Sequence, residues 1–179
     1  MNTTAPPPGG SASPEDSDAP RVASGLVWGI KATFLDYLSR MPDAKSSVDY
    51  GAQQMESGAY FFPLITADDY DSTTNEGTIK FGGSVSFAGH HGFLFVTFSD
   101  PWVTFNGDNS YLSISRPSAN PELNGRLHLL DIGPSKRFSH RGAHAWANLP
   151  TALRQEGVEL FNEAYPPGEG FDSLDIRID

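Results

Sequence analysis

The sequence predicts a mainly β domain, an antiparallel sheet or sandwich that carries two short helices. Several short segments alternate apolar and polar residues, which is typical of half-buried strands. The chain of 179 residues also holds 18 glycines and 14 prolines, which imply many turns. Helical spacing of apolar residues occurs in two places. At this length and with 38% hydrophobic residues, the chain has enough apolar residues to form one hydrophobic core.

Residues 1–23 are predicted to form a disordered tail ahead of a single domain at 24–179. The tail holds five prolines and three acidic residues and has almost nothing to bury. The domain therefore has to be built from the remaining residues alone.

The first element lies within residues 26–41, where apolar residues recur at intervals of three and four. This spacing predicts an amphipathic helix, which Pro42 ends. Gly29 weakens the first turn of such a helix, so a strand at 26–30 followed by a helix at 31–41 is equally compatible.

The middle of the chain is predicted to consist of strands joined by short turns. Alternation over residues 79–87 predicts a half-buried strand. Residues 93–98 are apolar on both faces and lead through a turn into residues 102–105, as a central hairpin or a bent strand. Further strands are predicted at 59–63, 111–115 and 126–132, with turns at 75–77 and 106–108.

The last part of the chain predicts one more helix and a final strand. Apolar spacing over residues 149–161 indicates a second short helix, although Gly157 weakens it. Even spacing of the last apolar residues, at 174, 176 and 178, suits an edge strand.

Composition excludes several classes of function. A formal net charge of −10 argues against binding to nucleic acids or anionic membranes, which requires a basic face. The sequence contains no cysteine, so disulfides, thiolate metal ligands and thiol nucleophiles are excluded. No segment reaches the roughly 18 apolar residues of a membrane span or resembles a secretory signal. As written, the chain is expected in the cytoplasm; a processed form would instead suit an extracellular or cell-surface location.

Common catalytic fingerprints are missing from the sequence, including a phosphate-binding glycine loop, a GxSxG elbow and an HExxH pair. The acidic run 68–71 lacks the spacing of a calcium loop and is interpreted as a solvated loop. His140 and His144 would share a helical face and hold a metal, but Gly142 between them favours a loop.

Two clusters remain as candidate sites. Positive residues gather at Lys136, Arg137, His140 and Arg141, a patch suited either to carboxylate ligands or to plain solvent exposure. His90 and His91 stand between two apolar segments and are flanked by glycines. Adjacent strand residues face opposite sides, so one histidine at most would face a pocket unless the glycines form a bulge.

Three segments stand out in order along the chain: LVWGIKATFLDY at residues 26–37, GSVSFAGHHGFL at 83–94, and the last part of the domain at 149–174. Together they resemble the HtaA domain of actinobacterial haem-uptake proteins. The first segment is similar to the opening Trp-Gly-x-Lys-x-Ser-Phe-x-x-Tyr of that family. Residues 83–94, GSVSFAGHHGFL, followed by FSDPWV at 98–103, resemble its central strand pair around a Gly-His. Residues 149–174, with Tyr165, Gly168 and the run FDSL at 171–174, look like its closing segment. The resemblance spans about residues 25–178 and implies a mostly antiparallel β fold with two short helices.

The resemblance also implies particular site residues. The haem-ligating tyrosine of the family falls on Tyr37, which would therefore lie on the first helix, and its pocket hydroxyl falls on Thr33, four residues earlier on the same face. Its Gly-His histidine falls on His90. Two positions depart from the family pattern: Thr33 replaces serine but keeps the hydroxyl, and His91 stands where glycine is usual. His91 would either crowd the haem site or add a second cofactor-binding histidine beside His90. Lys136 and Arg137 are then candidates to bind the haem propionates.

A tyrosine ligand suits ferric haem b, because a phenolate is a hard anionic donor for Fe(III). The sequence thus predicts capture, storage or transfer of haem, with a haem donor or acceptor protein as a partner. The alternative is a cytoplasmic haem enzyme that acts on peroxide or a nitrogen-containing substrate, with His91 and Thr33 as catalytic residues at the open sixth position. A third hypothesis is a β-rich interaction domain without a cofactor.

Overall fold

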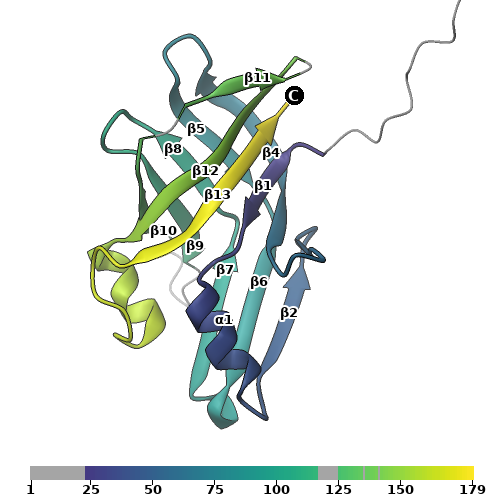
Figure 1. Ribbon diagram of the computed structural model, residues 1–179, viewed down its shortest axis with the longest axis vertical. Helices are drawn as coiled ribbons and strands as arrows, with labels where there is room; N and C mark the ends of the chain where they lie inside the picture. Colours follow the sequence, from purple (N-terminus) through teal and green to yellow (C-terminus); the bar gives the residue numbers. More distant parts are fainter. Residues whose placement is uncertain (1–22, 117–124, 135, 141) are drawn as a thin grey trace, which may run out of the picture.

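A computed structural model describes residues 23–116, 125–134, 136–140 and 142–179 (Figure 1). The predicted tail falls almost entirely outside these residues, and so does Arg141 of the positive patch. Within the described residues the fold is mainly β, as the sequence predicts, and every ladder between named strands is antiparallel. No helix in this part of the chain is long and apolar enough to cross a membrane.

The larger of two sheets closes on itself. Its neighbours follow the order β1-β13-β12-β10-β9-β8-β5-β4, and β1 pairs with β4 as well as with β13. Short strands β3 and β11 pair with β4 and β12. The bounds of these strands are β1 Gly25–Trp28, β3 Gln53–Gln54, β4 Tyr60–Asp71, β5 Glu76–Phe81, β8 Trp102–Phe105, β9 Tyr111–Arg116, β10 Gly125–Ile132, β11 Phe138–His140, β12 Ala143–Leu153 and β13 Gly170–Ile178.

A three-stranded sheet extends from one end of the closed sheet and carries the helix (Figure 1). It consists of β2 (Lys45–Asp49), β6 (Ser84–Gly89) and β7 (Leu94–Ser99). Helix α1 (Ala32–Ser39) packs on its inner face, where the ring of Phe34 meets that of Phe87 edge-on, with centroids 5.6 Å apart. A 3-10 turn, η1 (His90–Gly92), joins β6 to β7, and a second one, η3 (Gln155–Phe161), follows β12.

Aromatic side chains join the two sheets and the helix into one core. Phe161 of η3 contacts Phe34 of α1 and Phe98 of β7, and Phe98 in turn packs edge-on against Trp28 of β1, with centroids 5.2 Å apart. Phe34, Phe98, Phe161 and Trp28 are all buried. Truncation of a large core aromatic to alanine typically costs about 3–5 kcal/mol, so this cluster fixes the position of α1 on the sheets.

The beginning of the chain follows one of the two predicted alternatives, a strand followed by a helix. The prediction of one strand over residues 79–87 is wrong, because β5 and β6 belong to different sheets. The break lies at Gly83, which has φ +112° and would bring a Cβ to 2.8 Å from the Ala52 backbone nitrogen. Residues 93–98 and 102–105 likewise do not pair as a hairpin, and Phe95 is 68% exposed, so β7 is buried on one face alone.

Three further predictions need correction. The final strand is no edge, because β13 pairs with both β1 and β12. The second helix begins later than predicted and is a 3-10 helix, since β12 continues to Leu153. The acidic run 68–71 lies in β4 rather than in a loop. Of the turns, that at 106–108 is confirmed and the other lies at 72–75.

Candidate functional site

Helix α1 presents Tyr37 to solvent. Phe34 and Leu38 face the core and are buried, so the residues between them on the other side of the helix, including Tyr37, are exposed. Tyr37 is 46% exposed, so nearly half of this residue is in contact with solvent. Thr33 lies one turn earlier on this face and is also exposed, as the four-residue spacing predicts.

The β6–β7 connection brings His90 to Tyr37. Its Nε2 atom makes a hydrogen bond with the Tyr37 hydroxyl, and the two rings lie 5.9 Å apart at a tilt of 46°. The phenol donates to Nε2 when the imidazole carries its hydrogen on Nδ1; in the other tautomer it accepts from Nε2. The two residues are 53 positions apart in the sequence, and the packing of α1 on β6 brings them together.

The connection reaches this position through an uncommon backbone conformation. His90, His91 and Gly92 have φ values of 50°, 56° and 93°, all in the left-handed region. The regular alternation of a strand is therefore broken at the two histidines. His90 turns to Tyr37, whereas the His91 side chain is 91% exposed and approaches Asp43, with 3.8 Å between Nδ1 and the carboxylate.

A second tyrosine lies beside Thr33. The hydroxyl of Tyr165, in the segment between η3 and β13, is 3.4 Å from the Thr33 hydroxyl. The rings of Phe161 and Phe171 pack edge-on against Tyr165 and hold it in place. Sequence reasoning placed Tyr165 in a matched segment but gave it no role, because nothing in local spacing links it to a helix about 130 residues earlier.

Lys31 supports this side of the site. Its ammonium group donates to Glu169 at 2.7 Å and to the Gly170 carbonyl at 2.6 Å, and it lies 5.3 Å from the centre of the Tyr165 ring. The Lys31 side chain is buried and its charge is paired, so it holds the start of α1 against the segment that carries Tyr165.

The structure does not bring Lys136 and Arg137 together with Tyr37. They precede β11, which pairs with the start of β12 at the opposite end of the molecule from α1 (Figure 1). Arg137 donates to the Tyr70 hydroxyl at 2.8 Å and to the Ser72 carbonyl at 2.5 Å, so it ties this segment to the β4–β5 turn.

The pair His140 and His144 is not helical. Ser139 lies opposite His144, and His140 opposite Ala143, in the β11–β12 ladder. The described residues hold no group of three or more histidine, aspartate or glutamate side chains that would bind a metal ion. The prediction of a loop is therefore wrong, because His140 ends β11 and His144 lies in β12.

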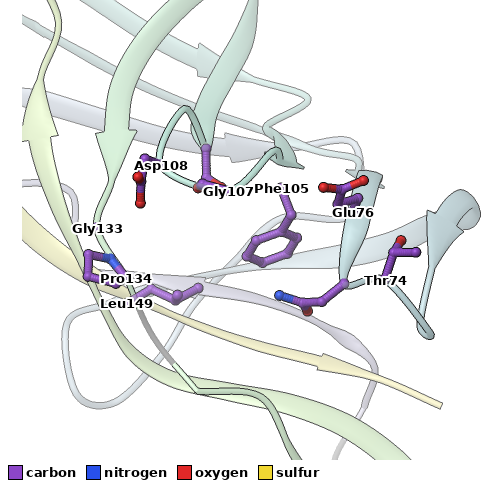
Figure 2. Close-up of a pocket in the computed structure, with 10 residues that line it drawn as sticks. Thr74, Glu76, Phe105, Gly107, Asp108, Gly133, Pro134 and Leu149 are labelled. Carbon is purple, nitrogen blue, oxygen red and sulfur yellow. The ribbon is translucent and has the colours of Figure 1, made fainter.

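A pocket of about 260 Å³ lies at the end of the closed sheet, where the β4–β5 and β8–β9 turns meet. Figure 2 shows the carboxylates of Glu76 and Asp108 at its rim and the apolar side chains of Phe105 and Leu149 inside. The residues that line it include none of the predicted site residues. The Tyr37–His90 pair is thus separate from this pocket.

The fold and this pair define a β-rich protein with an exposed tyrosine and histidine in hydrogen-bond contact, a donor set suited to a metal-containing ligand. A family model described as Htaa matches residues 23–177, and the chain therefore belongs to the HtaA family. Comparison with curated proteins gives no match.

Solved structures from Corynebacterium glutamicum share the fold. The C-terminal domain of HtaA superposes with a TM-score of 0.71 at 22% identity, over 87% of this chain and 96% of that one. The haem-binding protein HtaB gives 0.63 at 19% identity, over 86% and 90% of the two chains. The N-terminal domain of HtaA gives 0.62 at 20% identity, over 88% and 99%.

Proposed function

We propose that this domain binds ferric haem b, with the Tyr37 phenolate as axial iron ligand and His90 as the partner of the phenolic oxygen. The observation that carries the proposal is the hydrogen bond between the exposed Tyr37 hydroxyl and His90 Nε2. Membership of the HtaA family and the fold shared with a haem-binding protein support it.

The residues present fit such a ligand. A tyrosine in water keeps its proton up to a pH of about 10, so a phenolate ligand requires that the proton leave at neutral pH. An imidazole at hydrogen-bond distance can take or share this proton, and the exposure of Tyr37 leaves room on its other side. When bound, haem would supply a ferric iron, a Lewis acid that favours an anionic oxygen ligand.

Two hydroxyl groups near Tyr37 are suited to the carboxylates of haem. Thr33 lies one helical turn before Tyr37 on the same face of α1, and the Tyr165 hydroxyl is 3.4 Å from the Thr33 hydroxyl. Both hydroxyls can donate hydrogen bonds to an anion. We therefore assign propionate binding to Thr33 and Tyr165 rather than to Lys136 and Arg137, which lie at the other end of the molecule.

The arrangement suits capture, storage or transfer of haem. A phenolate favours the ferric state, so reduction of the iron weakens the bond to Tyr37 and allows release. The geometry gives no support to the enzyme hypothesis, because the His91 side chain is 91% exposed and approaches Asp43 instead of the Tyr37 hydroxyl. Thr33, its other predicted catalytic residue, contacts Tyr165.

A visible-absorption titration with hemin tests the proposal. We expect one hemin per chain, with the high-spin spectrum of a tyrosine-ligated ferric iron. Tyr37→Phe keeps the ring and removes the oxygen, so it should abolish these features and weaken binding. Tyr50→Phe is the matched control, because Tyr50 is 89% exposed and lies in the connection between β2 and β3 rather than on α1. A Tyr37→Phe variant with the parent spectrum and affinity would refute the assignment.

A further inference from the structure

The segment that carries His90 is held in a conformation that its own residues disfavour. Left-handed backbone is unfavourable for an L-residue, and here two adjacent non-glycine residues, His90 and His91, adopt it with φ values of 50° and 56°. Such a conformation persists where the surroundings determine it. The contacts that hold this segment therefore decide whether His90 reaches Tyr37.

These contacts come from the residues immediately after α1. The Asp43 carboxylate accepts a hydrogen bond from the His91 backbone N–H at 2.6 Å. The His90 backbone N–H lies 3.2 Å from the Met41 sulfur. Gly89 allows this close approach, because a Cβ there would collide with the same sulfur atom. The end of α1 thus holds the connection from which His90 projects.

We propose that Asp43 is a positioning residue of the haem site, whose carboxylate fixes the His90–Gly92 turn so that the His90 imidazole meets the Tyr37 hydroxyl. This inference rests on the proposed function where it is tested by the rate of hemin loss. Asp43 acts on the backbone of His91, one residue beyond His90, and is joined to Tyr37 through α1, so it links both members of the pair.

The hydrogen bond between the Asp43 carboxylate and the His91 N–H is of a kind that can hold the His90–Gly92 turn in place. A carboxylate that accepts a short bond from a backbone N–H makes a charge-assisted hydrogen bond, which is roughly twice as strong as a neutral one. The His91 N–H lowers the pKa of Asp43 below its ordinary value, and the nearby His91 imidazole acts in the same direction. The carboxylate is therefore charged at neutral pH.

The test compares Asp43→Ala with Asp43→Asn. Asparagine keeps an oxygen that can accept from the His91 N–H, whereas alanine removes it. We expect Asp43→Ala to speed hemin loss to apomyoglobin about tenfold, as removal of outer partners of metal ligands does, and Asp43→Asn to stay within about threefold of the parent. Asp36→Ala is the control, because it removes a carboxylate that pairs with Arg40 on the exposed side of α1.

A double variant separates positioning from general stability. If Asp43 acts through His90, Asp43→Ala should add less than about twofold to the hemin loss of a His90→Ala variant. The proposal would be overturned if the two substitutions multiplied each other's effects on the rate of hemin loss in the double variant. It would also be overturned if Asp43→Ala kept hemin as well as the parent does, or if Asp43→Asn lost hemin as fast as Asp43→Ala.

Nuclear Overhauser contacts between the Tyr37 and His90 rings of the haem-free protein give an independent readout. They should be lost in Asp43→Ala and kept in Asp43→Asn. If the parent itself fails to bind hemin, the proposed function fails, while this measurement still decides the role of Asp43. Ring contacts that persist in Asp43→Ala would refute it.

Discussion

At the scale of single residues, the site depends on a polar contact that is made at the surface. Tyr37 and His90 lie in exposed positions, where water competes for each hydrogen bond. A net contribution of about 0.5–1.5 kcal/mol is usual for such a bond, so the pair adds little to folding. Its importance lies in the site, since the hydrogen bond places the His90 imidazole against the oxygen that we propose as the iron ligand.

The first residue-scale prediction concerns His90. His90→Ala removes the partner of the Tyr37 oxygen, so the spectrum of the hemin complex should shift and hemin should be lost about tenfold faster. Stopped-flow transfer to apomyoglobin measures this rate. His91→Ala is the matched control, because its side chain is exposed and directed away from Tyr37. Equal, large losses in both variants would mean that the two histidines form one site.

The second residue-scale prediction concerns the titration of Asp43. Its pKa lies below the ordinary value of 3.8, chiefly because it accepts a hydrogen bond from the His91 N–H. A lowered pKa means that the stabilising effect is fully present above pH 3.8 and is lost as the pH falls through the lowered value. Carboxyl-carbon NMR of the haem-free protein should show this titration, with Asp43→Asn to assign the signal. A midpoint above 3.8 would contradict the contact.

The roles of Tyr37 and His90 in the site could be predicted from the sequence only through its resemblance to the HtaA family. The four-residue spacing places Thr33 and Tyr37 on one helical face, and the structure agrees. The choice between His90 and His91 was open, because regular strand alternation does not hold in left-handed backbone. Asp43 carries no local signal, since its partner is a backbone N–H far along the chain.

At the scale of elements, the pair Gly82 and Gly83 separates two strands that the sequence pattern joins. The alternation of residues 79–87 continues unbroken through Gly82 and Gly83, so the pattern predicts one strand, yet the chain changes sheets there. The alternation of apolar and polar residues shows which face of a strand is buried, but it does not show where the chain changes its pairing partner. The same limitation applies to residues 93–105, for which the sequence predicts a hairpin or a bent strand: β7 and β8 follow one another in the chain but belong to different sheets, so they form no hairpin.

An element-scale prediction follows for the β6–β7 connection. His91→Gly places glycine where φ is 56°, which removes steric cost in the folded state and adds chain entropy in the unfolded state. The free energy of unfolding should stay unchanged or rise by up to about 1 kcal/mol, and hemin binding should remain intact because the N–H that bonds Asp43 is kept.

Urea unfolding and a hemin titration measure the two effects. His90→Gly is the matched comparison, since it gains the same backbone freedom at φ 50° but loses the imidazole that contacts Tyr37. A His91→Gly variant that loses more than about 1 kcal/mol would show that the imidazole, and not the backbone, holds the turn.

At the scale of the whole molecule, the closure of the larger sheet cannot be predicted from local patterns in the sequence. β1 pairs with β4 on one side and with β13 on the other, which joins Leu26 to Phe62 and to Ile176. The strand that the periodicity predicts at the end of the chain is present as β13. The periodicity does not show that β1, near the start of the chain, pairs with this strand. The edge predicted for residues 171–178 is therefore interior.

The last prediction concerns the molecule as a carrier. A carrier has to release its ligand, and Tyr37, the iron ligand that we propose, is 46% exposed rather than enclosed in the core. Hemin should therefore pass to apomyoglobin, and faster after reduction with dithionite, because a phenolate favours the ferric state. Peroxidase activity should be weak and little changed by His91→Gly, since the His91 side chain is directed away from Tyr37. Slow transfer, together with peroxide-dependent turnover that collapses in His91→Gly while hemin stays bound, would instead establish an enzyme.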